Sequence, residues 1–210
     1  MVDKQNIGLI GLGLLGSAMA ERLLAAGFRV QGYDPVAEKR EELRALGGEP
    51  AGSAAEVWQN CPRVLLSLPN SAVSAQALAA ARPFLRQGLL ILDTTTGDPD
   101  EVAALGAGLD AAQVGYLDAT VGGSSKQVRA VDVITMTGGK RADFDACRDI
   151  FDAFSRRSFY VGPWGSGARM KLVTNLVLGL NRLVLAEALG FASSMGLDAP
   201  MALEVLKSSS

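Results

Sequence analysis

The stretch Gly11-Leu12-Gly13-Leu14-Leu15-Gly16 decides the fold of this chain. It stands between a short apolar run, residues 6–11, and a segment with helical spacing, residues 14–26. A GxGxxG turn between a strand and a helix provides a tight turn and lets the backbone approach a pyrophosphate. The N-terminus of the following helix then offers unpaired N–H groups to the phosphates. The stretch therefore predicts a dinucleotide-binding strand–turn–helix, and a glycine turn without a ligand is the alternative.

Asp34 stands at the end of the next predicted strand, residues 29–33. It lies about 20 residues after the last glycine of the turn, as in dinucleotide-binding folds. A carboxylate at that place accepts hydrogen bonds from the adenine-ribose hydroxyls and repels a 2′-phosphate, so it predicts NAD as the cofactor. Arg29, Lys39 and Arg40 could still help to hold a phosphate, and NADP therefore remains possible.

Strand and helix patterns alternate from the N-terminus to about residue 162, which is typical of a parallel α/β sheet. After Gly162-Pro-Trp-Gly165 the pattern changes, and residues 166–195 contain neither a proline nor a strand pattern. We therefore predict a Rossmann-type, doubly wound, mostly parallel sheet in a dinucleotide-binding domain, residues 1–163. A long helix then opens an all-α C-terminal domain, residues 164–210, which we expect to be incomplete without more chain or a partner subunit.

Two further loops follow predicted strands, at the edge of the sheet where open α/β sheets bind ligands. Leu68-Pro69-Asn70 follows the strand over residues 63–67, and residues 93–99 follow the strand over residues 89–93. The second loop contains Thr96, and threonine hydroxyls there could bond the nicotinamide ribose or carboxamide. Capping of the next helix is an equally good interpretation of these polar residues.

Lys171 and Asn175 are four residues apart near the start of the long helix, so they lie on one helix face. A lysine among Met170, Leu172 and Val173 at the mouth of a cleft would be partly desolvated. Desolvation lowers the pKa of a lysine and lets it exchange protons nearer neutrality. From spacing alone, a surface lysine beside a buried apolar stripe remains the better interpretation.

The composition excludes several classes of chemistry. The 210 residues contain no histidine, which excludes a Ser-His-Asp or Cys-His mechanism and an HExxH zinc site, and we expect no metal. The net charge of −2 gives no reason to expect nucleic acid or an anionic membrane as a partner. The two cysteines fit a reducing cytoplasm as small buried residues.

No segment is expected to serve as a signal peptide or a membrane span. Residues 7–20 follow Lys4 as an apolar run, but Asp3 and the glycines favour a folded strand–turn–helix. The longest uncharged stretch of the long helix, residues 172–181, is too short to cross a bilayer. That helix is therefore expected to be buried in protein.

Four segments in order give the chain a resemblance to the β-hydroxyacid dehydrogenase family, which includes enzymes for hydroxyisobutyrate and tartronate semialdehyde. They are Gly8-Leu-Ile-Gly-Leu-Gly-Leu-Leu-Gly16, Asp93-Thr-Thr-Thr-Gly-Asp-Pro99, Leu117-Asp-Ala-Thr-Val-Gly-Gly123 and Gly165-Ser-Gly-Ala-Arg-Met-Lys-Leu-Val-Thr-Asn175. The C-terminal residues 196–209 also match the style of the family. The resemblance covers essentially the whole chain, and the combination is far more specific than any single motif.

The resemblance implies an NAD(P)-dependent oxidoreductase that moves hydride between nicotinamide and a small β-hydroxyacid or its semialdehyde. Lys171 would then be the general acid/base for the hydroxyl proton, and Asn175 would orient the substrate oxygen or the lysine. Thr96 and the Leu68-Pro69 loop would contact the nicotinamide half. Residues 118–124 would hold the substrate carboxylate, and the resemblance fits a homodimer or homotetramer.

The chain departs from the family in the carboxylate loop. Relatives usually read Asp-Ala-Pro-Val-Ser-Gly-Gly, whereas this chain has Asp118-Ala-Thr-Val-Gly-Gly-Ser124. Gly122 therefore stands where the family has its carboxylate-binding serine, and Gly123 follows it. Either Thr120, Ser124 or Ser125 replaces that hydrogen bond, or the substrate differs.

Two alternative functions remain at this point. An imine or ketone reductase on the same scaffold usually has Asp or Tyr in the place of Lys171, so the lysine argues against it. A nucleotide-binding protein with little catalysis would fit Gly122 and the short helical segment.

Overall fold

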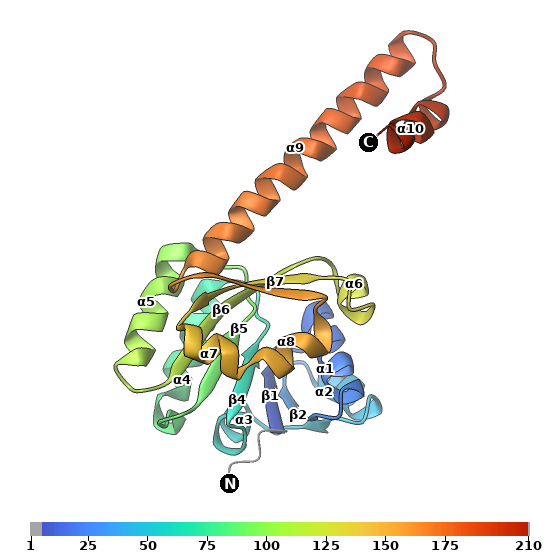
Figure 1. Ribbon diagram of the computed structural model, residues 1–210. Coiled ribbons are helices and arrows are strands. Elements are labelled where there is room, and N and C mark those ends of the chain that lie inside the picture. Colours follow the sequence, from blue (N-terminus) through green and yellow to red (C-terminus); the bar gives the residue numbers. More distant parts are fainter. Residues whose placement is uncertain (1–5, 210) are drawn as a thin grey trace. The chain divides into compact units, whose positions relative to one another are not determined.

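The computed structural model describes residues 6–209 (Figure 1). The strands are β1 (Asn6–Ile10), β2 (Arg29–Tyr33), β3 (Glu49–Pro50), β4 (Arg63–Leu66), β5 (Leu90–Asp93), β6 (Gly115–Gly122), β7 (Ile134–Gly139) and β8 (Arg157–Gly162). The helices before β8 are α1 (Leu14–Ala25), α2 (Ala37–Ala45), α3 (Ala54–Asn60), α4 (Ser71–Ala81), the 3₁₀ helix η1 (Arg82–Phe84), α5 (Pro99–Asp110), α6 (Ser125–Arg129), α7 (Arg141–Ala146) and α8 (Arg148–Phe154). After β8 come α9 (Ser166–Ser194) and α10 (Ala199–Ser208).

Within residues 6–209, the eight strands form one sheet in the order β3-β2-β1-β4-β5-β6-β7-β8. Every neighbouring pair is parallel except β6 and β7, which run antiparallel. β1 pairs with β2 on one side and with β4 on the other, so the chain crosses over β1 and continues outward in the opposite direction. This reversal is the doubly wound topology, and it confirms the fold class predicted from the sequence.

The core lies on both faces of the sheet. Leu65 of β4 packs in a cluster with side chains of α1, α2, α6, α7 and α8. Its neighbours Val64 and Leu66 pack on the other face with side chains of α3, α4 and α5. Because successive side chains of a strand point to opposite faces, a strand that is covered twice must be apolar at every position. This is why residues 64–66 of β4 are all apolar, between Arg63 at the start of the strand and Ser67 just after its end.

Several details differ from the sequence prediction; among them, β3 was not predicted, and the helix predicted over residues 141–154 is divided into α7 and α8. β6 continues to Gly122, whereas a strand was expected only over residues 116–119. β7 begins at Ile134, later than the predicted start at residue 131, because Val131 has a positive φ of 55° in the turn after α6. The short helices α3 and α6 were not predicted. Each is a single capped turn or two, too short for helical periodicity to identify.

The chain divides into two compact units, one up to Lys171 and one from Leu172 onward, so the division falls within α9. The change from α/β to helical structure comes earlier, where β8 ends at Gly162. In the second unit Asp198 caps α10 by accepting the N–H of Met201 at 2.9 Å. The long helix predicted over residues 166–195 is α9, and the predicted helix over residues 201–207 lies within α10.

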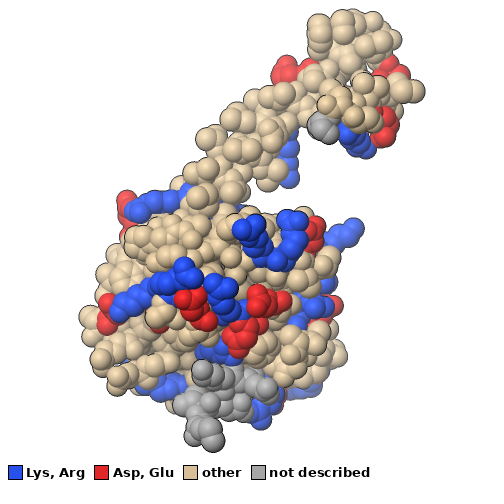
Figure 2. Space-filling model, viewed as in Figure 1, with Lys and Arg blue, Asp and Glu red and all other residues tan. Residues whose placement is uncertain are grey.

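Helix α9 is long and apolar enough to cross a membrane when judged by length and composition alone, since a window of 18 residues within it has a mean hydropathy of 1.5. The expectation that no segment qualifies is therefore wrong by this criterion, because the charged residues of α9 are widely spaced. None of that window is buried within the described residues, so the expectation of a helix buried in protein is not met here, although a buried core helix satisfies the same criterion. Figure 2 shows the contrast in charge, with few charged side chains along α9 and many over α7 and α8.

The glycine turn gives a direct test of packing. Gly11 has a φ of 94°, and a Cβ there would lie 2.2 Å from the carbonyl oxygen of Ser67. Gly11→Ala should therefore lower the free energy of unfolding, with about 1–3 kcal/mol from the backbone conformation alone.

Gly13→Ala is the matched control, because a Cβ at Gly13 meets no atom within 4 Å. Urea denaturation of both variants measures the effect. Equal stability of the two variants would contradict the packing argument.

Candidate active site

A cavity of about 600 Å³ lies beside the glycine turn, at the carboxyl ends of β1, β2, β4 and β5. The residues that line it come from the ends of strands, the loops after them and the first turns of α1 and α4: Ile10, Gly11, Gly13, Leu14, Leu15, Tyr33, Asp34, Pro35, Ser67, Leu68, Pro69, Val73, Thr94, Thr95 and Thr96. Parallel strands bring their carboxyl ends to one edge, so loops that are far apart in sequence meet there. The cavity lies where the strand order reverses.

The glycine turn presents backbone rather than side chains to this cavity. Gly11 donates its N–H to the carbonyl of Tyr33 at 2.9 Å, which ties the turn to the end of β2. Helix α1 begins after Gly13, without a side-chain cap and without an acidic residue in its first turn. Its N-terminal N–H groups are therefore available to an anion, and the open space beside Gly13 leaves room for one. These features fit the pyrophosphate of a dinucleotide.

Asp34 is held at the edge of the cavity by two backbone hydrogen bonds. Its Oδ2 accepts the N–H of Leu12 at 2.8 Å, and its Oδ1 accepts the N–H of Val36 at 2.9 Å. Each carboxylate oxygen keeps a further lone pair that can accept a ribose hydroxyl. Arg40 donates to the carbonyl of Asp34 at 2.6 Å, and its guanidinium carbon lies 5.7 Å from the centre of the Tyr33 ring.

A buried polar network joins the two remaining loops. The hydroxyl of Thr95 accepts the N–H of Leu68 at 3.0 Å, which holds the loop after β4 against the loop after β5. Asp93 accepts the N–H of Thr95 at 3.0 Å and the hydroxyl of Tyr116 at 3.0 Å. Burial raises the pKa of Asp93, and these hydrogen bonds oppose that increase. The network fixes the backbone next to Thr96, whose exposed side chain lines the cavity.

Most of the cofactor-binding residues expected from the sequence line this cavity, and three do not. Leu12 is buried in the core and contributes its backbone N–H to Asp34. Gly16 is buried, and a Cβ there would lie 2.0 Å from the carbonyl oxygen of Gly11, so it serves the packing of α1. Asn70 caps α4 by accepting the N–H of Val73 at 3.0 Å. That contact matches the capping alternative stated for this loop.

Tyr33, Pro35, Ser67 and Val73 also line the cavity and were not predicted. Three of them flank predicted residues at the ends of β2 and β4. The rule that ligands bind beyond the carboxyl ends of parallel strands could have identified these three. Val73 lies inside α4, and no local signal marks it.

Lys171 is partly buried in the second turn of α9, and its Nζ donates to the carbonyl of Val121 at 2.7 Å. Desolvation by burial lowers the pKa of this lysine, which favours the partly desolvated lysine over the surface lysine that spacing alone made the better interpretation. β5 ends opposite Asp118, and β6 runs on beyond that point to Gly122. Val121, and with it the Lys171 ammonium, therefore lies at the same edge of the sheet as Thr94–Thr96.

Asn175 follows in the second unit, one helical turn beyond Lys171, and its side chain is exposed. Its role in orienting a substrate stays a prediction.

The residues expected to hold a substrate carboxylate fall into two groups. Thr120 is fully buried, and its hydroxyl donates to the carbonyl of Gly167 at 3.0 Å, so it is not placed to contact a substrate. Gly122 ends β6, Gly123 follows with an exposed backbone, and Ser124 caps α6 by accepting the N–H of Gln127 at 3.4 Å. The exposed segment 122–125 is therefore the part of the loop that a ligand can reach.

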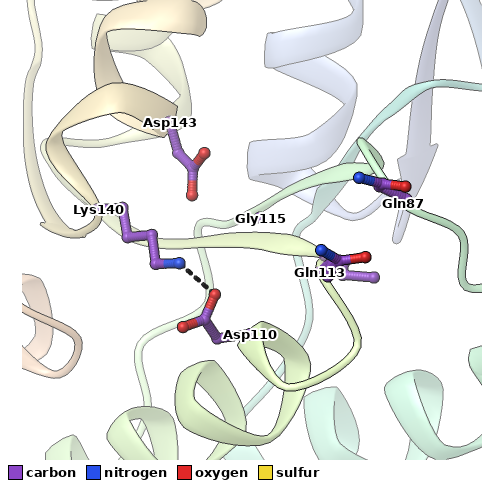
Figure 3. A pocket seen from close by; sticks show the side chains of 7 residues that line it. Gln87, Asp110, Gln113, Gly115, Lys140 and Asp143 are labelled. Carbon is purple, nitrogen blue, oxygen red and sulfur yellow. Dashed lines mark hydrogen bonds and ion pairs between the residues drawn. The ribbon is translucent and has the colours of Figure 1, made fainter.

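A second cavity, of about 380 Å³, lies at the opposite edge of the sheet (Figure 3). Polar side chains surround it, among them Gln87, Gln113 and Asp143, and Lys140 forms an ion pair with Asp110 at its mouth. It lies at the start of β6, at the end of that strand away from the glycine-turn edge. Within residues 6–209, no group of three or more acidic or cysteine side chains could hold a metal ion.

The two cysteines are buried, and neither forms a disulfide. This agrees with the expectation that they serve as small core residues.

Two family sequence models match the chain. The NAD binding domain of 6-phosphogluconate dehydrogenase matches residues 6–162, and the NAD-binding region of NADP-dependent 3-hydroxyisobutyrate dehydrogenase matches residues 165–210. Mitochondrial 3-hydroxyisobutyrate dehydrogenase of Rattus norvegicus is 29% identical over 213 residues, which cover 100% of this chain and 64% of the rat protein. The chain therefore spans less than two thirds of the length of that relative.

Solved structures are similar over nearly the whole chain. A 3-hydroxyisobutyrate dehydrogenase of Mycobacterium tuberculosis, solved with L-serine, has a TM-score of 0.90 and 26% identity, covering 97% of this chain and 70% of that one. An imine reductase of Streptomyces aurantiacus has a TM-score of 0.86 at 23% identity, covering 96% and 73%, which shows a shared fold. With its glycine turn, Asp34 and Lys171 at one edge of the sheet, this chain belongs to the β-hydroxyacid dehydrogenase family and carries the NAD(P)-binding domain of that family.

Proposed function

We propose that the protein is an NAD(P)-dependent dehydrogenase that oxidises a small β-hydroxyacid, or reduces the matching semialdehyde, with Lys171 as the general acid/base. The observation that carries the proposal is the place of the Lys171 ammonium. It is partly desolvated, bonded to Val121, and at the sheet edge that holds the dinucleotide cavity. Family membership supports the same chemistry.

Lys171 is the group that moves the proton. When bound, the nicotinamide ring accepts or supplies the hydride. In the oxidation direction a neutral lysine takes the hydroxyl proton, and in the reduction direction the ammonium returns it to the carbonyl oxygen. Desolvation lowers the pKa of Lys171, and this increases the fraction of neutral amine near neutral pH. Oxidation should therefore become faster as the pH rises through the pKa of the lysine.

The substrate class follows from the ligands at this edge. The segment from Gly122 to Ser125 offers backbone N–H groups and the hydroxyl of Ser125, which suit a carboxylate. Gly122 provides no side-chain donor, and the N–H and hydroxyl of Ser124 both donate to Oε1 of Gln127, so the carboxylate must rely on the remaining backbone N–H groups and on Ser125. The relative solved with L-serine holds a 3-hydroxy acid, which supports a substrate of this size.

We propose NAD as the preferred cofactor, because the Asp34 carboxylate lies where a 2′-phosphate would be repelled. The many exposed apolar side chains of α9 support a homodimer or homotetramer. The two cysteines, both buried and outside any disulfide, support a cytoplasmic protein. An imine reductase is the second candidate on the shared fold, and the presence of Lys171 disfavours it.

Lys171→Ala should lower kcat by about 10²–10⁴-fold, because the general acid/base is lost. Nucleotide binding should stay intact, since the cavity residues are unchanged. Reduced-cofactor absorbance with a panel of small β-hydroxyacids measures kcat, and fluorescence titration measures the Kd for NADH.

Lys140→Ala is the matched control for this experiment, because Lys140 lies at the opposite edge and pairs with Asp110. Equal turnover of the Lys171 variant and the wild type would remove the lysine from the mechanism. Faster turnover of cyclic imines than of hydroxyacids by the wild type would favour the second candidate.

Asp34→Arg should shift the ratio of the Kd values for NADH and NADPH toward NADPH by about tenfold or more, since a cation replaces a carboxylate beside the 2′ position. Titration of both nucleotides measures this ratio. Asp34→Asn is the control, because it keeps an acceptor for the N–H of Leu12 without adding a cation. An unchanged preference in the arginine variant would show that Asp34 is not at the ribose.

A further inference from the structure

Asp118 is a buried carboxylate that neither the cofactor cavity nor the substrate segment uses. It lies in the middle of β6, opposite Asp93 of β5 and Gly138 of β7, and only 2% of its surface is exposed. Its Oδ2 accepts the N–H of Ala168 at 3.0 Å. The N–H groups of Gly165 and Gly167 also stabilise its charged form. A side chain from the sheet therefore caps the start of α9.

Helix α9 has no capping side chain of its own. It begins after Gly162-Pro-Trp-Gly165, and none of these residues has a side-chain oxygen. The first N–H groups of a helix have no partner within the helix, and burying them without one costs free energy. The Asp118 carboxylate supplies that partner from a residue that is 50 positions earlier in the chain.

The helix can reach the carboxylate because two neighbours lack side chains. A Cβ on Gly167 would lie 2.3 Å from the backbone oxygen of Asp118 and 2.8 Å from its Oδ2. A Cβ on Gly138 would lie 2.3 Å from Oδ1. Both glycines are therefore needed for the close approach of α9 to β6.

Three successive contacts then join α9 to the same strand. Asp118 bonds the N–H of Ala168, Thr120 donates its hydroxyl to the carbonyl of Gly167, and the Nζ of Lys171 donates to the carbonyl of Val121. The cap and the lysine are one helical turn apart on α9 and three residues apart on β6. Any shift of the first turn along the strand would therefore move the ammonium away from Val121.

We propose that Asp118 is the positioning residue of this site, since it fixes the first turn of α9 on β6 and thereby sets the location of the Lys171 ammonium. This inference rests on the proposed function of Lys171, and it adds a residue that does not touch substrate or cofactor.

The surroundings of Asp118 are acidic and buried. The charge of Asp118 raises the pKa of Tyr116, whose hydroxyl donates to Asp93. The first turn of α9 contacts Oδ2 of Asp118, and its Oδ1 has no hydrogen-bond partner within the described residues. Burial raises the pKa of Asp118 to about 6, although the N–H groups of α9 favour the charged form. The folded state therefore binds this proton more tightly than the unfolded chain, so the contribution of Asp118 to stability falls as the pH rises from about 4 to 6.

The test compares Asp118→Ala, which removes the cap, with Asp118→Asn, which keeps one acceptor oxygen for Ala168. In the alanine variant we expect faster hydrogen exchange of the amides over residues 165–171 and a pKa of Lys171 closer to that of a solvated lysine, as read by NMR of Nζ. We expect kcat to fall by about 10- to 100-fold with unchanged Kd for NADH, because a small misplacement of a catalytic group is costly. The asparagine variant should recover most of each effect.

Asp143→Asn is the matched control, because Asp143 also has a buried carboxylate oxygen without a partner and a raised pKa, but it lies at the second cavity. It should leave exchange over residues 165–171 and the pKa of Lys171 unchanged. If Asp118→Ala does not fold, Thr120→Val removes the second contact with α9 and should produce smaller shifts in the same direction.

The proposal would be overturned if the alanine variant shows unchanged hydrogen exchange over residues 165–171 and an unchanged pKa of Lys171. If the alanine variant does not fold, the same result in Thr120→Val would overturn it. A wild type that turns over no hydroxyacid would instead overturn the proposed function. The exchange and NMR measurements would still decide whether Asp118 positions the lysine.

Discussion

The crossover of the chain at β1 is the constraint on which the rest of the molecule depends. β1 has β2 on one side and β4 on the other, and the connection after β1 leads to α1 on one face of the sheet while the connection after β4 leads to α4 on the other face. Loops that leave in opposite directions cannot cover the carboxyl end of β1, and a crevice remains there. The glycine turn, Asp34 and the threonine loop all border this crevice because parallel strands end on the same edge.

Strand β6 extends this arrangement into the second half of the site. It is the last strand in the parallel set, and it continues beyond the end of β5 to pair with the antiparallel β7. Its extra residues lie beside the cofactor edge, and the first turns of α9 lie along it. One strand thus lies between the threonine loop and Lys171 and holds them at a fixed separation. Such an arrangement suits chemistry that requires fixed distances between reacting groups.

Much of the cofactor site could be predicted because its signals are local. A dinucleotide-binding turn needs glycines at a fixed spacing, for the tight turn and for the close approach of the backbone to a phosphate, and it needs free N–H groups at the following helix N-terminus. The pattern of residues 11–16 therefore predicts the turn directly from the sequence. Asp34 follows from the same spacing rule. Thr120 shows the limit of such arguments. Its hydroxyl was predicted as a possible ligand for the substrate carboxylate. In the register of β6 against β7, the hydroxyl instead points inward and donates to the carbonyl of Gly167.

The sequence by itself determined the α/β alternation, the glycine turn, the acidic residue after the second strand and the lysine at the start of a long helix. Each of these depends on residues that are close together in the chain. Only the tertiary structure decided that a carboxylate in the middle of β6 caps α9, and that the Lys171 ammonium bonds Val121. Those contacts join residues 50 positions apart, and their geometry is set by how a helix packs on a strand, which no local pattern of residues records.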